Sequence, residues 1–142
     1  MQPAQLKRGK DIENYVFGEV DNYKIHRIDP YLGQINDINS FKRNVEKIKS
    51  FIQRHKIAHN RSGVRGSIPD GIIPDGSAFE FKTFSNVTEI NTKMDQILRH
   101  CQRLESRKCY VIILRPTRIE FILFNLMSNG ILKKSSHNIE DY

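Results

Sequence analysis

Three charged side chains lie close to a tight turn near the middle of the chain, and their types suit metal-assisted chemistry. Asp70 precedes a Pro-Asp-Gly turn, and Glu80 and Lys82 follow that turn two residues apart. Carboxylates offer the hard oxygen atoms through which Mg²⁺ is held, and a lysine ammonium beside them can orient water or offset negative charge. The three residues are therefore a candidate metal site.

Alternation along residues 78–84 decides which of these side chains share a face. Phe79 and Phe81 alternate with Glu80 and Lys82 in this segment. Successive side chains of a strand point to opposite faces, so the aromatic residues belong to a core and the two charged residues lie side by side on the other face. A Glu-x-Lys triplet alone is also common on solvated strands, which makes the upstream aspartate important.

The turn itself predicts where Asp70 lies. Pro74-Asp75-Gly76-Ser77 has proline where a turn fixes φ and glycine where φ > 0 is needed, which places Asp75 at the tip of a hairpin. Asp70 is about as far from this turn as Glu80 is on the returning strand, so we expect the two carboxylates to meet across the hairpin. Such close like charges favour a divalent cation between them, because one lysine is a poor bridge for both.

At this motif the sequence resembles the PD-(D/E)xK nuclease superfamily, through Pro69-Asp70 and Glu80-Phe81-Lys82. The order of elements over roughly residues 40 to 124 is also similar. The resemblance implies a metal-dependent phosphodiester hydrolase in which Asp70 and Glu80 bind Mg²⁺ or Mn²⁺, with the backbone carbonyl of Phe81 as a further ligand. Lys82 would position or activate the attacking water.

A further metal-site carboxylate is implied by the same resemblance, because many members of the superfamily take one from the helix before the catalytic strands. Glu46 stands on such a predicted helix, over residues 40–55. Its alternative role is an ion pair with a basic neighbour on the same helix. Glu19 and Glu13 are the rival donors, and the sequence does not choose among the three.

Lys93 and Gln96 lie on a helix predicted over residues 88–104, and the resemblance implies that they face the active site. The residue four positions after Gln96 is His100 rather than tyrosine. This departs from the glutamine-then-tyrosine spacing of the RecB-like exonuclease branch and argues against that branch.

The 142-residue chain carries a formal net charge of +7, and its isoelectric point is about 9.5. Clustered lysines and arginines gain free energy from phosphate counterion release, so a nucleic-acid partner is expected. His59 is a candidate general acid or base, although an ordinary surface histidine is the more common case. The candidate nucleic-acid contacts are Arg61, Arg65, Lys47 and Arg99.

Within the superfamily, the small basic domain most resembles the C-terminal toxin domains of contact-dependent growth inhibition systems, several of which cut transfer RNA. The Asp-Gly-Ile-Ile hairpin, the Glu-Phe-Lys-Thr strand and the helix with Lys93 and Gln96 carry this looser similarity. It implies RNA rather than DNA as substrate, a cognate immunity protein, and action in the cytoplasm of a target cell. A DNA endonuclease of a phage or mobile element, a non-catalytic nucleic-acid-binding module and a plain interaction domain remain alternatives.

The remaining pattern predicts a single domain, an α/β sandwich around a mixed central sheet with a restriction-endonuclease-like core. No apolar run is long enough to span a bilayer, and no zinc-type spacing surrounds Cys101 and Cys109, which we expect to be buried. The expected elements are a loose lead-in or linker over 1–12, a β-hairpin over 15–28, a loop over 29–39, a helix from the N-cap Ser40 to about His55, a short strand within 56–67, strands over 109–114 and 119–124, and a last short strand at 131–132.

Overall fold

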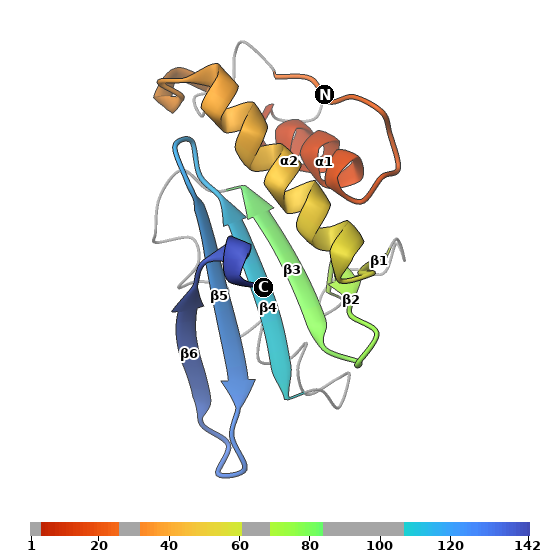
Figure 1. Cartoon of the computed structure of the whole chain (residues 1–142), viewed down its shortest axis with the longest axis vertical. Coiled ribbons are helices and arrows are strands. Elements are labelled where there is room, and N and C mark those ends of the chain that lie inside the picture. Colours follow the sequence, from red (N-terminus) through yellow and green to blue (C-terminus); the bar gives the residue numbers. More distant parts are fainter. Residues whose placement is uncertain (1–3, 26–31, 61–68, 84–106) are drawn as a thin grey trace.

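A mixed β-sheet forms the centre of the molecule, and both α-helices of the described residues pack on one of its faces (Figure 1). The computed structural model describes residues 4–25, 32–60, 69–83 and 107–142. The helical elements are α1 (Ala4–Val16), α2 (Ile38–Arg54) and the short 3₁₀ helices η1 (Leu32–Gln34) and η2 (Ile139–Asp141). The class is therefore α/β, as the sequence predicts.

Over the described ranges, the sheet has six strands in sequence order, β1 to β6. Neighbouring strands are antiparallel except for β3 and β4, which are parallel. The mixed sheet confirms the sequence expectation. The strands are β1 (Ala58–His59), β2 (Gly71–Ile72), β3 (Ala78–Thr83), β4 (Lys108–Leu114), β5 (Ile119–Leu126) and β6 (Leu132–His137).

Helix α2 forms because its apolar residues recur at helical spacing and bury one stripe against the sheet. The predicted helix is confirmed, but it begins two residues before Ser40. Asp37 is the N-cap, and its Oδ1 accepts hydrogen bonds from the backbone N–H groups of Asn39 (3.0 Å) and Ser40 (3.1 Å). An aspartate at this position also places negative charge at the positive end of the helix dipole.

The N-terminal segment differs from the expectation. Residues 4–16 form α1, where a loose lead-in over 1–12 and the start of a hairpin over 15–28 were expected, and no strand occurs within the described residues 17–25 of that hairpin. Ile12 and Val16 lie four residues apart and are each 1% exposed, so this one-sided burial stabilises a helix that local sequence signals barely indicate.

Helix α1 ends directly after residues whose types are also common in strands. Gly18 adopts φ 78°, a left-handed conformation that suits glycine. Its N–H donates to the carbonyl of Tyr15 (3.0 Å), and the N–H of Glu19 donates to the carbonyl of Asn14 (2.8 Å). These two bonds form a Schellman motif, which ends the helix just after its β-branched and aromatic residues.

The two faces of β3 enter two different cores, as the alternation predicts. Phe79 and Phe81 pack with the helices in the larger cluster, whereas Ala78 packs with residues of β4 and β5 on the opposite face. Cys109 lies in this second cluster at 0% exposure, which confirms its expected burial. Strand β4 is buried on both faces, as expected of a central strand.

The C-terminal strands follow the predicted order with extended ends. Strands β4 and β5 are joined by the two-residue loop Pro116-Thr117, which the N–H of Arg115 closes by donating to the carbonyl of Arg118 (2.8 Å). The last strand, β6, is longer than the two residues expected and pairs antiparallel with β5.

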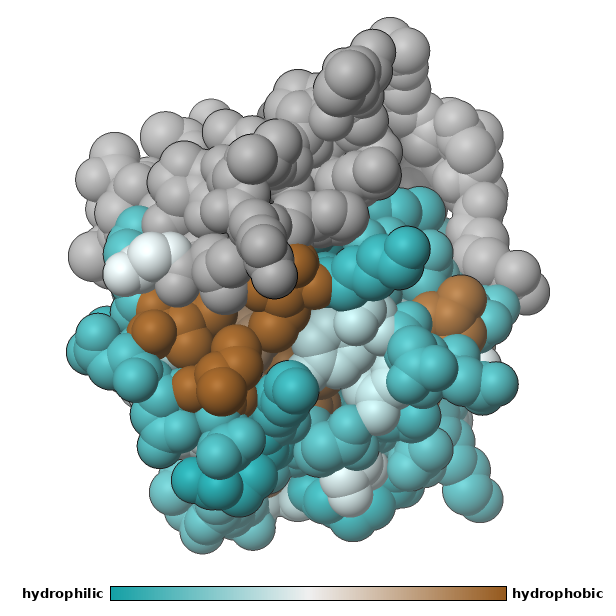
Figure 2. Space-filling model, turned by 90° about the horizontal axis from the view of Figure 1, so that it is seen from above, coloured by the Kyte–Doolittle hydropathy of each residue, from teal (hydrophilic) through white to brown (hydrophobic). Residues whose placement is uncertain are grey.

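Within the described part of the chain, no helix combines the length and apolarity needed to cross a membrane. Seen from above, most of the described surface is hydrophilic, and a hydrophobic area lies next to the residues drawn in grey (Figure 2).

Candidate active site

The hairpin of β2 and β3 brings Asp70 and Glu80 to corresponding positions. Gly71 pairs with Phe79 and Ile72 pairs with Ala78, and the same register continued by one residue sets Asp70 opposite Glu80. The turn has the expected chemistry, because the carboxylate of Asp75 accepts a hydrogen bond from the backbone N–H of Ser77 (2.8 Å). Gly76 adopts φ 93° at the tip.

Lys82 approaches both carboxylates. Its Nζ lies 3.9 Å from Oδ2 of Asp70 and 3.5 Å from Oε2 of Glu80. Oδ2 of Asp70 also accepts a hydrogen bond of 2.9 Å from the backbone N–H of Phe81. Strand β3 therefore contributes a carboxylate, an ammonium and a backbone donor over three consecutive residues, and the donor fixes the orientation of Asp70.

The cluster is more buried than an alternating polar face suggests. The side chain of Glu80 is 3% exposed, compared with 18% for Asp70 and 26% for Lys82. Burial and then the charge of Glu80 raise the pKa of Asp70 well above its usual range, although Lys82 and the hydrogen bond from Phe81 oppose the shift. The charge of Lys82 opposes this rise in the pKa of Asp70 without cancelling it.

Glu13 of α1 is a third carboxylate that acts on this cluster. Its charge contributes to raising the pKa of Asp70 and that of Lys82. Burial on its own would lower the pKa of Lys82, but the charges of Asp70, Glu80 and Glu13 together reverse that effect, so Lys82 stays a cation. Of the three rival donors considered from sequence, the structure brings Glu13 into electrostatic contact with the motif.

His59 of β1 bridges two glutamates next to the cluster. Its Nε2 lies 3.1 Å from Oε2 of Glu13, and its Nδ1 lies 3.3 Å from Oε1 of Glu19. The imidazole is 4% exposed and stacks on the ring of Phe17 at 4.2 Å between centroids. His59 is therefore buried between two glutamates and is not an ordinary surface histidine. Its contact with Glu13 holds that carboxylate in place.

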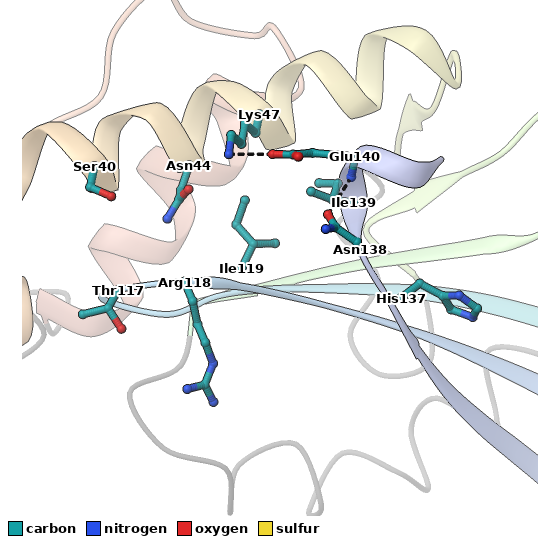
Figure 3. Close-up of a pocket in the computed structure, with 10 residues that line it drawn as sticks. All are labelled: Ser40, Asn44, Lys47, Thr117, Arg118, Ile119, His137, Asn138, Ile139 and Glu140. Atoms are coloured by element: carbon teal, nitrogen blue, oxygen red, sulfur yellow. Dashed lines mark hydrogen bonds and ion pairs between the residues drawn. The ribbon is translucent and has the colours of Figure 1, made fainter.

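The other sequence candidates make different contacts. Glu46 accepts a hydrogen bond from the hydroxyl of Tyr15, which with burial raises the pKa of Tyr15 to about 12. Nζ of Lys47 forms an ion pair of 2.7 Å with Glu140 of η2 (Figure 3). Five candidates lie outside the described residues: Arg61, Arg65, Lys93, Gln96 and Arg99.

The chemistry of the donor set fits Mg²⁺ or Mn²⁺. Among the described residues, no group of three or more histidines, cysteines or carboxylates is close enough to form a complete metal cage. Mg²⁺ does not need one, because it commonly keeps several waters and takes one or two carboxylates from the protein. Asp70 and Glu80 are such a pair, and a bound cation would relieve their repulsion.

Comparison of the chain with protein-family models, with curated proteins and with solved structures found no match. Its function is therefore inferred from the motif and from the geometry of the residues around it.

Proposed function

We propose that the chain is a metal-dependent nuclease that hydrolyses phosphodiester bonds, with RNA as its favoured substrate. The observation that carries the proposal is the position of Nζ of Lys82, within 4 Å of carboxylates from Asp70 and Glu80 on one buried hairpin (3.9 and 3.5 Å). Burying two carboxylates beside one ammonium is costly, because each charged group loses hydration that the ion pairs must replace. Such an arrangement is typical of functional sites.

Each residue has a distinct role in this reaction. Asp70 and Glu80 would hold Mg²⁺ or Mn²⁺, which when bound neutralises charge on the phosphate and lowers the pKa of coordinated water. Nζ of Lys82 donates a hydrogen bond that orients the attacking water towards phosphorus. A bond forms between phosphorus and the water oxygen, one ester bond breaks, and the leaving oxygen takes up a proton.

The surrounding residues keep these groups in place. The N–H of Phe81 fixes one oxygen of Asp70, and the N–H of Asn60 donates to the backbone carbonyl of Asp70 (2.8 Å), tying β1 to the motif. His59 holds the carboxylate of Glu13, so the charge of Glu13 stays directed at the cluster. Rigid support of this kind lets an active site work without reorganising during the reaction.

A restriction-endonuclease-like core is part of the proposal. It is supported by the order of α2, the β2–β3 hairpin, the parallel β3–β4 pair and antiparallel β5. The resemblance to contact-dependent toxin domains favours transfer RNA as substrate, the cytoplasm of a target cell as the place of action and an acidic immunity protein as partner. The net charge of +7 supports a polyanionic substrate.

The test is incubation of the purified protein with total RNA and with plasmid DNA, each with Mg²⁺ or with EDTA, followed by mapping of the cut ends. We expect Mg²⁺-dependent cleavage of RNA that Asp70→Asn and Glu80→Gln abolish. Lys133→Ala, which removes an exposed charge on β6, is the control and should cleave normally. Asp70→Asn and Glu80→Gln proteins that cleave as fast as wild type would reject the site, and binding without cleavage would indicate a non-catalytic module.

A further inference from the structure

A second charged cluster lies at the loop between β4 and β5. Nε and Nη2 of Arg115 contact the two carboxylate oxygens of Glu120 at 2.7 and 3.2 Å. Nη2 and Nε of Arg118 contact Oε1 of the same carboxylate at 2.6 and 3.2 Å. Two guanidinium groups share one carboxylate, so the cluster has an excess of one positive charge and can accept a further anion.

Strand register places this cluster in the same row of the sheet as Lys82. Lys82 is opposite Ile113 on β4, and Ile113 is opposite Glu120 on β5. Adjacent strands are about 4.8 Å apart, so the backbones at Lys82 and Glu120 are separated by about 10 Å. A separation of this size lets one nucleic-acid strand, which carries a phosphate at every nucleotide, contact both clusters.

The two arginines differ in their exposure. The side chain of Arg115 is 6% exposed and holds Glu120 through two parallel hydrogen bonds, whereas that of Arg118 is 62% exposed. Figure 3 shows the side chain of Arg118 extending away from α2. Arg115 and Glu120 thus form a rigid base, and Arg118 is the member that can contact another molecule.

We propose that Arg118 binds a backbone phosphate of the nucleic acid a few nucleotides from the bond that is hydrolysed beside Lys82. The inference rests on the proposed function for the identity of the substrate. A guanidinium matches a phosphate through two hydrogen bonds, and Glu120 limits the directions in which it can point. The contact is with the backbone, so it adds affinity without base specificity.

The test measures binding separately from cleavage. Fluorescence anisotropy with a labelled single-stranded RNA in EDTA gives the affinity of wild type, Arg118→Ala, Arg118→Lys and Arg107→Ala over a series of salt concentrations. Arg107 is the matched control, because it is an exposed arginine at the opposite end of β4 that donates to the carbonyl of Leu126. Thermal melts establish that each variant is folded.

We expect Arg118→Ala to weaken binding about three- to tenfold at low salt and to reduce the slope of log K against log salt by about 0.7. Arg118→Lys should keep the slope, because it keeps the charge, but should bind more weakly than wild type. If Arg118→Ala does not fold, weaker binding with an unchanged slope in Arg118→Lys, together with an unaffected Arg107→Ala, is the supporting result.

The binding and cleavage results together separate this inference from the proposed function. Equal effects at positions 118 and 107, no effect at 118, or wild-type protein that binds no RNA would overturn the role of Arg118, whatever the cleavage assay gives. Salt-sensitive binding that depends on Arg118, without any Mg²⁺-dependent cleavage by wild type, would support the phosphate contact and reject the nuclease.

Discussion

The two charged clusters in one row of the sheet have opposite electrostatic designs. Around Lys82, two carboxylates share one ammonium, and burial together with Glu80 raises the pKa of Asp70. Around Glu120, two guanidinium groups share one carboxylate, and the hydrogen bonds led by that of Arg115 lower the pKa of Glu120 against the effect of burial. The surroundings of the first cluster therefore oppose the ionisation of Asp70, whereas those of the second favour the ionisation of Glu120.

This difference indicates which cluster is the candidate for a reaction. The pair of Arg115 and Glu120 stabilises the fold, and Arg118 adds a positive charge that can bind an anion. A cluster that keeps a buried carboxylate under unfavourable charge lowers stability, and proteins keep such arrangements mainly where a ligand or a reaction requires them. Variants of the first cluster should mainly change the cleavage rate, whereas variants of the second should mainly change the free energy of unfolding. Measuring both quantities tests this comparison.

The largest expected effect is on cleavage. Lys82→Ala should slow the chemical step on the order of 10²-fold, because the attacking water loses its positioning donor. Single-turnover cleavage of the mapped substrate measures this rate, and circular dichroism checks the fold. Lys133→Ala should keep the wild-type rate of that step. A Lys82→Ala protein as fast as wild type would remove the contrast between the clusters.

The next effect is on stability. Glu120→Gln should lower the free energy of unfolding by about 1–3 kcal/mol, because the buried Arg115 loses its counterion. Urea denaturation measures the change, and Glu140→Gln, which breaks the exposed pair with Lys47, should leave the midpoint unchanged. Equal midpoints for the Glu120 variant and wild type would show that the second cluster is not a structural anchor.

The stabilisation that Glu120 contributes has a defined pH dependence. The pKa of Glu120 is lower in the folded protein than its usual value of 4.5, so the folded state holds the ionised form more firmly. The stabilisation is complete above the unfolded pKa and is lost as pH falls through the folded pKa. The difference between wild type and Glu120→Gln should therefore be constant near neutral pH and shrink below about pH 4.5. A difference that grows in acid would contradict this assignment.

Local signals explain why the hairpin could be predicted from the sequence. In the turn, Pro74 fixes φ, Asp75 bonds the backbone two residues on, and Gly76 tolerates φ > 0. The alternation along β3 assigns its faces without any distant contact. Asp70 and Glu80 are paired by counting from that turn. The core strands β4 and β5 can also be predicted from the sequence, because a long apolar run indicates a buried strand.

Distant contacts explain what the sequence did not predict. Helix α1 is stabilised by burying Ile12 and Val16, and its few apolar positions do not mark a helix by themselves. The approach of Glu13 to the motif depends on that helix packing beside β3, and no spacing in the sequence encodes it. The cluster at Glu120 has only a weak signal in the sequence, namely two arginines that flank a two-residue turn. The strand register is needed to show where this cluster lies in the sheet.

A smaller effect on stability should have the opposite sign at the motif. Asp70→Asn removes a buried charge beside Glu80 while keeping an oxygen that can accept the hydrogen bond from Phe81. We expect the variant to be more stable than wild type by about 0.5–1 kcal/mol in EDTA, although it is inactive. Urea denaturation in EDTA measures this. A loss of stability similar to that of Glu120→Gln would mean that both clusters are structural.

The smallest expected effect is the response of the fold to the cation. Mg²⁺ binds the folded protein at Asp70 and Glu80 and should raise the melting temperature of wild type by about 1–3 °C at millimolar concentration. Asp70→Asn should not respond, whereas Glu120→Gln, although less stable, should show the same increment as wild type. Ca²⁺ and an equal ionic strength of KCl separate specific binding from screening. An increment that survives in Asp70→Asn would place the cation elsewhere, and then the strain around Lys82 would need another explanation.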